Sequence, residues 1–184
     1  MRSDIKNNVR VRIKLEIIKV GGLSVKYIIQ YSLASILLFF STFAAWYEGS
    51  AIRENPWEWK YTAFFSKKFN GWIANSSDIS QLDHFIYAAK FNPIYPILMI
   101  LSLSYILILS GYLLLKNDTN KMSIFLLSFG VIHVLLGIMI SDSPTIGGKY
   151  FTFTFLTIGI ISLVLSFLKV MKRNGKYGNL NLLH

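Results

Sequence analysis

The most isolated ionisable side chain is His133, which lies within a run of apolar residues from 122 to 140. A titratable group inside an apolar span is a functional candidate, because burying it in hydrocarbon is unfavourable. Haem held between helices commonly takes two axial ligands, and no other apolar run contains histidine. We therefore expect a neutral His133 that bonds to a Ser or Tyr hydroxyl of a neighbouring helix. Haem or quinone binding at His133 is the alternative.

A second group of candidate residues is aromatic and lies between the first two apolar runs. All four tryptophans fall between residues 46 and 72. Tryptophan and tyrosine rings favour the headgroup region of a membrane, where an apolar ring and a polar N–H or O–H are both accommodated. The candidates for binding a partner protein or lipid are Trp57, Trp59, Tyr61, Phe64, Phe65 and Trp72.

Two short helices are predicted to carry these rings. In the first, Asn55 caps the helix, Pro56 fills the first turn, and Glu58 reaches back to the cap. The aromatic residues at 57, 61, 64 and 65 then share one face of an amphipathic helix, which either lies along the membrane surface or packs over the bundle. The second helix is predicted to have Asp78 as its cap and to end at Asn92, before a proline.

Other catalytic or metal-binding chemistry finds little support in the sequence. Asp83 and His84 could join Glu48 or Glu58 around a metal, but the spacing matches no known ligand pattern, so we expect no metal and no cofactor. The chain has no cysteine, which excludes thiol–disulfide relay enzymes. It also contains no phosphate-binding glycine loop or zinc-protease motif.

The elements that position these residues are four apolar runs. They span residues 27–47, 93–115, 122–140 and 150–168, and none contains Lys, Arg, Asp or Glu. About 20 apolar residues suffice for a helix to cross a bilayer, and isolated strands cannot cross one. With 53% hydrophobic and 15% charged residues, the chain departs from soluble composition. The sequence predicts an all-α membrane protein, a four-helix bundle formed by residues 27–170.

Membrane orientation follows from the placement of Lys and Arg. One side of the membrane holds 13 of the 19 basic residues. They lie in residues 1–26, in the turn at 116–121, at the end of the last span and in the tail at 171–184. The opposite side holds 6, mostly in the loop 48–92. The positive-inside rule places both termini in the cytoplasm and makes the loop an extracellular cap. The whole net charge of +10 then lies on the cytoplasmic side.

The basic leader at 1–26 has two further interpretations. Each basic group near an anionic inner leaflet contributes about 1 kcal/mol of attraction, so we expect the leader to face lipid rather than nucleic acid. The first span could also be the apolar part of a signal peptide, with Thr42-Phe43-Ala44 as the cleavage site. Its length and the long leader favour an uncleaved helix.

Three stretches carry a resemblance to a known family. They are AWYEGS at 45–50, NPWEWKY at 55–61 and DISQLDHFIYAAKF at 78–91. Over about residues 23–115 the chain resembles the YjdJ-like small membrane proteins of Bacillus-type bacteria, a family with a domain of unknown function. The resemblance implies the plasma membrane of a Gram-positive cell, and it implies no functional residues.

Taken together, these features predict a non-enzymatic envelope protein that binds a partner protein or lipid through its aromatic outer loop. The first alternative is a haem- or quinone-binding enzyme subunit that uses His133. The second is a small transporter or channel subunit, which would need a polar path through Ser102, Ser104, Ser128 and His133. The spans contain no paired carboxylates, which argues against ion coupling.

Overall fold

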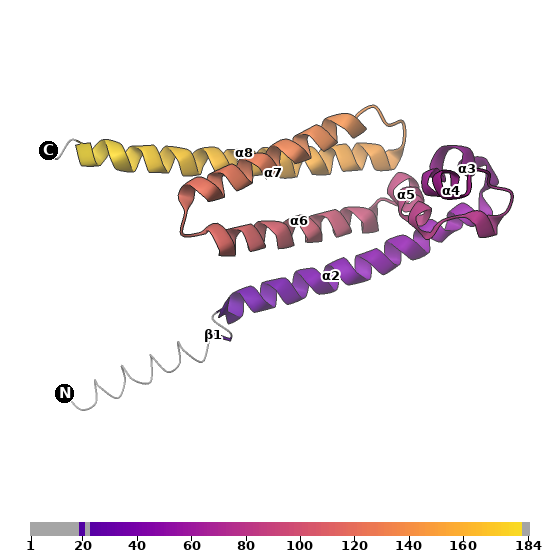
Figure 1. The fold of residues 1–184 in the computed structure, drawn as a ribbon, viewed down its shortest axis with the longest axis horizontal. Helices are drawn as coiled ribbons and strands as arrows, with labels where there is room; N and C mark the ends of the chain where they lie inside the picture. The colour runs from indigo at the N-terminus through magenta and orange to yellow at the C-terminus, as the bar shows by residue number, and fades with distance from the viewer. Residues whose placement is uncertain (1–18, 21–22, 182–184) are drawn as a thin grey trace.

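The computed structural model describes residues 19–20 and 23–181, which are almost entirely helical (Figure 1). A two-residue antiparallel pair, β1 (Lys19–Val20) and β2 (Leu23–Ser24), precedes the first helix. Most of the predicted basic leader lies outside the described residues. The four long helices are α2 (Val25–Gly49), α6 (Ile94–Leu115), α7 (Thr119–Ile140) and α8 (Ile146–Asn181).

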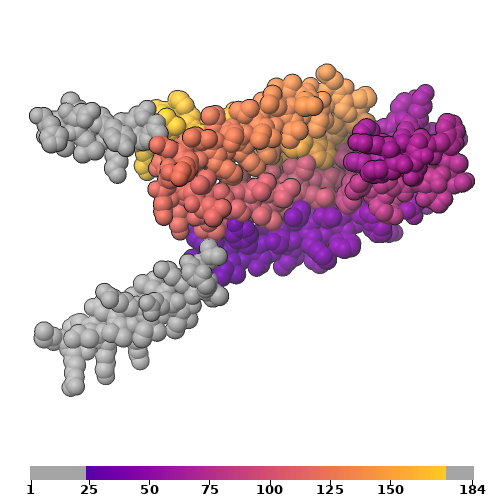
Figure 2. Space-filling view, in the orientation of Figure 1, coloured from indigo at the N-terminus to yellow at the C-terminus, as the bar shows by residue number. Residues whose placement is uncertain are grey.

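Five short helical segments join α2 to α6. They are η1 (Ser50–Glu54), α3 (Pro56–Thr62), α4 (Phe64–Asn70), η2 (Ser76–Asp78) and α5 (Gln81–Phe91). We call residues 50–92 the cap. It lies at the end of the long helices that is opposite the start of α2 and the end of α8 (Figure 1), and Figure 2 shows it as a compact mass over that end.

All four long helices are long and apolar enough to cross a membrane. The predicted spans coincide closely with α2, α6, α7 and the first part of α8. This confirms the all-α fold class, with four membrane-spanning helices and a short-helix cap between the first and the second. Helix α8 differs from the prediction in length, because it continues beyond residue 168 to Asn181 and includes most of the predicted tail.

Within the bundle the long helices bury many small and polar side chains, whereas most of the exposed side chains are large and apolar. Large apolar side chains are exposed along every long helix, as Phe40, Leu114, Met139 and Phe153 illustrate. The buried positions are mostly Ser, Ala, Gly and His: Ala34, Ser41, Ala45, Gly49, Ser102, Ser104, Gly111, Ser123, Gly130, His133, Gly137, Ser162 and Ser166. Small residues let helices approach closely where lipid covers the outside, so this distribution suits a bilayer.

The bundle is built from two helix pairs, α2 with α6 and α7 with α8 (Figure 1). Within the second pair, a Cβ built on Gly130 would lie 3.0 Å from the carbonyl oxygen of Gly159. The backbones of α7 and α8 therefore approach each other closely at Gly130. Within the first pair, the Tyr31 hydroxyl and Ser110 Oγ lie 2.7 Å apart in a hydrogen bond.

Candidate functional site

The cap has its own small core, and Trp59 belongs to it. Ile52, Ala63 and Ile79 are buried together, and Trp59 packs against them. The indole N–H of Trp59 donates to the carbonyl oxygen of Ile52 at 2.8 Å. Trp59 is a predicted partner-binding residue, but its side chain packs against the core of the cap. Its position off the aromatic stripe was the sequence signal for this difference.

The predicted continuous aromatic helix is divided at Ala63, whose φ of −81° and ψ of 62° are not helical. Helix α3 begins at Pro56 as predicted, but the Asn55 side chain does not cap it. The Asn55 amide instead donates to the Ala51 carbonyl oxygen at 2.9 Å and the Tyr87 hydroxyl at 3.0 Å. Glu58 accepts from the Thr62 hydroxyl at 3.1 Å rather than reaching back.

Asp83 of α5 supports the start of α4. Its carboxylate is fully buried and accepts the backbone N–H of Phe65 at 2.9 Å and of Ser66 at 2.8 Å. The Ser66 hydroxyl also donates to it. An acidic group at a helix N-terminus satisfies unpaired N–H groups and complements the helix dipole. Asp83 thus caps a helix from a different part of the chain.

Lys90 supports the end of α3 in the complementary way. Its ammonium group donates to the carbonyl oxygen of Tyr61 at 2.8 Å and to the Thr62 hydroxyl at 3.0 Å. Burial lowers the pKa of Lys90, while the nearby charge of Glu58 raises it. Lys90 lies seven residues after Asp83, about two helical turns along α5. One face of α5 therefore stabilises both helix ends at the break at Ala63. Asp83 contacts the start of α4, and Lys90 contacts the end of α3.

The start of α5 also differs from the prediction. Ser80 is the residue that caps it, accepting the Leu82 N–H at 3.3 Å. The Asp78 carboxylate accepts the backbone N–H groups of Ala74 at 2.9 Å and Asn75 at 3.0 Å, and these bonds lower the pKa of Asp78. The helix ends at Phe91 with Asn92 as its C-cap, close to the predicted end.

Most of the remaining predicted aromatic residues are exposed on the cap. Exposed fractions are 81% for Trp57, 70% for Tyr61, 60% for Phe64 and 81% for Trp72. Phe65 is only partly exposed and stacks on Phe69. Phe69 is itself 66% exposed, and the stripe pattern did not include it. We call Trp57, Tyr61, Phe64, Phe69 and Trp72 the cap aromatic surface.

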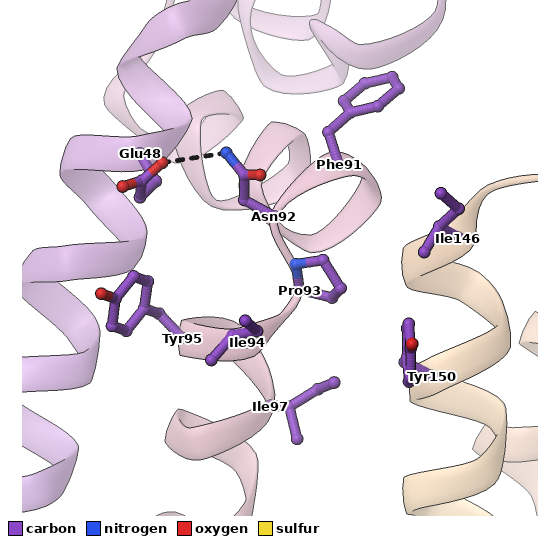
Figure 3. A pocket seen from close by; sticks show the side chains of 9 residues that line it. All are labelled: Glu48, Phe91, Asn92, Pro93, Ile94, Tyr95, Ile97, Ile146 and Tyr150. Atoms are coloured by element: carbon purple, nitrogen blue, oxygen red, sulfur yellow. Dashed lines mark hydrogen bonds between the residues drawn. The ribbon is translucent and has the colours of Figure 1, made fainter.

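The acids considered beside Asp83 and His84 are engaged separately. Glu48 accepts from the Asn92 side chain at 3.0 Å, above Pro93 in Figure 3, and Glu58 accepts from Thr62. Among the residues described here, no three His, Asp or Glu side chains gather where they could hold a metal.

His84 is buried without a polar partner. Its side chain is 1% exposed, it lies 5.8 Å from the Trp46 ring, and neither ring nitrogen has a hydrogen-bond partner. Burial lowers the pKa of His84 and the positive charge of Arg53 lowers it further, while the Trp46 backbone and the negative charge of Asp83 raise it by less. The environment of His84 therefore favours the neutral ring.

A cleft of about 360 Å³ lies where the cap meets α6 and α8 (Figure 3). Glu48 and Asn92 form its polar edge, while Tyr95, Ile97 and Tyr150 supply apolar and aromatic walls. A second, more apolar cavity of about 460 Å³ lies between α5 and the α7–α8 connection. Both cavities can accept apolar groups at the junction of cap and bundle.

His133 lies in the bundle with both ring nitrogens engaged. Nε2 is 3.3 Å from Ser104 Oγ on α6, and Nδ1 is 2.9 Å from the Phe129 carbonyl oxygen. The rings of Phe129 and Phe155 lie 4.2 and 5.7 Å from the imidazole. The hydroxyl contact agrees with the expected serine partner, and it joins the two helix pairs.

Comparison with known proteins finds relatives for the first part of the chain. Residues 28–115 match a family described as a domain of unknown function, DUF4306. The chain is 39% identical over 101 residues to the uncharacterized protein YjdJ of Bacillus subtilis (strain 168). That alignment covers 54% of this chain and 93% of the relative. No solved structure matches the chain. The family match extends from α2 through the cap to the end of α6, and α7 and α8 lie beyond it.

Proposed function

The chain belongs to the DUF4306 family, whose function is unknown, and we propose that it is a plasma-membrane protein. Its cap binds a partner protein in the cell envelope. It spans the bilayer four times, with both termini in the cytoplasm and the cap outside. The sequence segments on the proposed cytoplasmic side contain 13 basic residues, against 6 on the other side, which supports this orientation. The role is a binding role and not an enzymatic one.

The observation that carries this proposal is the exposure of the cap aromatic surface. Its five members occur within residues 57–72, and each has at least 60% of its area exposed. Burying such a side chain contributes about 1.5–3 kcal/mol, and aromatic residues dominate the binding energy of many interfaces. The cap core and the contacts of Asp83 and Lys90 hold their backbone in place. This pre-organisation lowers the entropy lost on binding.

The alternatives receive less support from the geometry. Haem ligation by His133 would require it to give up its bond to Ser104 or to Phe129. A polar path for transport would need Ser128, but that side chain is on the exposed face of α7 and bonds to the Phe125 carbonyl oxygen. Ser102, Ser104 and His133 are buried instead.

Site-specific photocrosslinking in intact cells tests the proposal. A benzoylphenylalanine at position 72 should give a discrete protein adduct, whereas the same probe at Met139, which is 79% exposed on α7, should give only lipid adducts. Adding Trp57→Ala should remove the protein adduct without changing the thermal midpoint of the purified protein. The matched variant Trp59→Ala should lower that midpoint, because Trp59 supports the cap core.

Two results would count against partner binding. Lipid adducts alone at position 72 would assign the aromatic surface to the membrane interface. A protein adduct that persists at full yield in Trp57→Ala would show that the cap aromatic surface does not form the contact.

A further inference from the structure

All four long helices line a groove at the end of the bundle opposite the cap. Its volume is about 440 Å³. The lining residues are Lys26, Tyr27, Gln30, Tyr105, Ile108, Leu109, Tyr112, Met122, Leu126, Leu165 and Lys169. The groove therefore lies where the α2–α6 pair meets the α7–α8 pair.

The end of this groove farthest from the cap is cationic. Lys26 comes from α2 and Lys169 from α8. Among the side chains of residues 24–172, the one ion pair joins Lys121 to Asp118 at 3.4 Å, so no carboxylate there neutralises either groove lysine. Tyr27 and Tyr112 line the same groove, and their ring centroids are 6.2 Å apart. Two ammonium groups with neighbouring phenol hydroxyls suit a phosphate group.

An apolar section continues from this end along α2 and α6. It has a volume of about 360 Å³ and shares Gln30 and Tyr105 with the cationic section. On α2 the lining positions are 26, 27, 30, 33, 34 and 37, which form one continuous helical face. These positions extend about 16 Å along the helix, close to the depth of one leaflet's hydrocarbon.

Ser102 lies in the wall of the apolar section. It is 3% exposed, and its Oγ has no hydrogen-bond partner. Serine hydroxyls in helices commonly bond to a backbone carbonyl of the preceding turn, as Ser110 does here with Ile106 at 2.7 Å. Ser102 lies ten residues, or about 15 Å, before Tyr112 on α6, so it lines the acyl-chain part of the groove and is too deep to reach the ester groups beside the phosphate.

We propose that the groove binds one anionic diacyl phospholipid. Its phosphate contacts Lys26 and Lys169, and one acyl chain lies along the apolar section between α2 and α6. A phospholipid fits because the cationic and apolar sections are joined in the direction of the helix axes. The bilayer also supplies this ligand directly to a groove within the spanning helices. This site is at the opposite end from the cap, so it does not depend on partner binding there.

Native mass spectrometry of the detergent-purified full chain tests the headgroup contact. Dioleoylphosphatidylglycerol should bind more tightly than dioleoylphosphatidylcholine, which has the same acyl chains and no net charge. Each lysine contributes about fivefold in affinity. The double variant Lys26→Gln/Lys169→Gln should therefore weaken phosphatidylglycerol binding by roughly 25-fold.

The matched control is Lys116→Gln/Lys172→Gln, which removes the same charge from exposed positions at the same end outside the groove. It should retain phosphatidylglycerol affinity within about twofold. Equal losses in the two double variants would show diffuse attraction and overturn the proposal. Equal affinities of the wild-type chain for the two lipids would overturn it as well. Circular dichroism must show the same helical content in every variant.

A second pair of variants tests the acyl contact. Leu33 lines the apolar section, and Leu103 is exposed on α6 outside it. Leu33→Trp should fill the section and weaken phosphatidylglycerol binding, while Leu103→Trp should not. Glycerol phosphate at the same concentration should fail to displace the lipid. Displacement by glycerol phosphate, or unchanged binding in Leu33→Trp, would assign the site to a free phosphate group and contradict the lipid proposal.

Discussion

Asp83 accepts three hydrogen bonds in the interior of the cap. Two backbone N–H groups and the Ser66 hydroxyl all donate to its carboxylate. Asp83→Ala leaves these buried donors unsatisfied and should lower the free energy of unfolding of the cap by about 3 kcal/mol. Chemical denaturation followed by tryptophan fluorescence measures this, since all four tryptophans lie at residues 46–72. Asp142→Ala, at an exposed position, is the control and should change little. Equal stability of Asp83→Ala and wild type would contradict the capping role.

His84 makes the stability of the cap depend on pH. Its folded-state pKa lies below the ordinary value of 6.5, chiefly because of burial. As pH falls below about 6.5, the unfolded chain takes up a proton that the folded cap resists. The free energy of unfolding should therefore be highest above that pH and decrease as the pH falls below about 6.5.

Replacing the imidazole isolates this contribution. His84→Gln should reduce the slope of stability against pH over the same interval, measured by denaturant midpoints at several pH values. Ser77→Ala, at an exposed position in the cap, should keep the wild-type slope. An identical slope in His84→Gln and wild type would show that another group controls the acid sensitivity.

Residue patterns predicted some side-chain roles and missed others for an identifiable reason. Trp57 and Tyr61 are four residues apart, so local helical spacing predicts that they share one face of a helix. Both side chains are exposed in the structure. The contacts of Asp83 with Ser66, and of Lys90 with Tyr61, join residues 17 and 29 positions apart. Such contacts depend on how helices pack, so no local pattern shows them. The sequence around Asp83 suggests only a metal ligand, because its hydrogen-bond partners lie on a different helix.

At the scale of elements, α5 joins the cap to the bundle. Gly49 of α2 and Gly147 of α8 both contact its backbone, at the carbonyl groups of His84 and Ala89. A Cβ at either glycine would overlap those carbonyl oxygens, so only glycine allows this approach. Two membrane-spanning helices thus fix the cap helix from two directions.

Gly147→Ala tests this docking. Because backbone must move to make room, the variant should lose about 1–3 kcal/mol of stability and expose the cap to limited proteolysis. Lys149→Ala lies at an exposed position near the same end of α8 and should keep the wild-type cleavage rate. Wild-type proteolysis and stability in Gly147→Ala would show that α8 does not support the cap.

Helix length and helix continuity differed in how well they could be predicted. The spans were predictable because an apolar run without charge identifies them in any context. The break at Ala63 was not, because the amphipathic pattern continues across it from Trp57 to Phe65. Tertiary contacts from Asp83 and Lys90 stabilise the two helix ends that a continuous helix would not have.

The whole molecule combines the family unit with a second helix pair. The DUF4306 match covers the α2–α6 pair with its cap, whereas α7 and α8 follow it and form the other pair. The hydrogen bond between Ser104 and His133 crosses from one pair to the other. The groove proposed to bind a phospholipid also requires both pairs, because α2, α6, α7 and α8 all line it.

Labelling of single introduced cysteines tests the proposed membrane arrangement most directly. The natural chain has no cysteine, so each introduced thiol reports one position. Ser77 is exposed in the cap, and Asn117 is exposed in the turn between α6 and α7 at the opposite end. In intact cells, an impermeant maleimide should label Ser77→Cys and should reach Asn117→Cys only after permeabilisation. Labelling of Asn117→Cys in intact cells, with Ser77→Cys protected, would contradict the orientation and place the cap aromatic surface inside the cell.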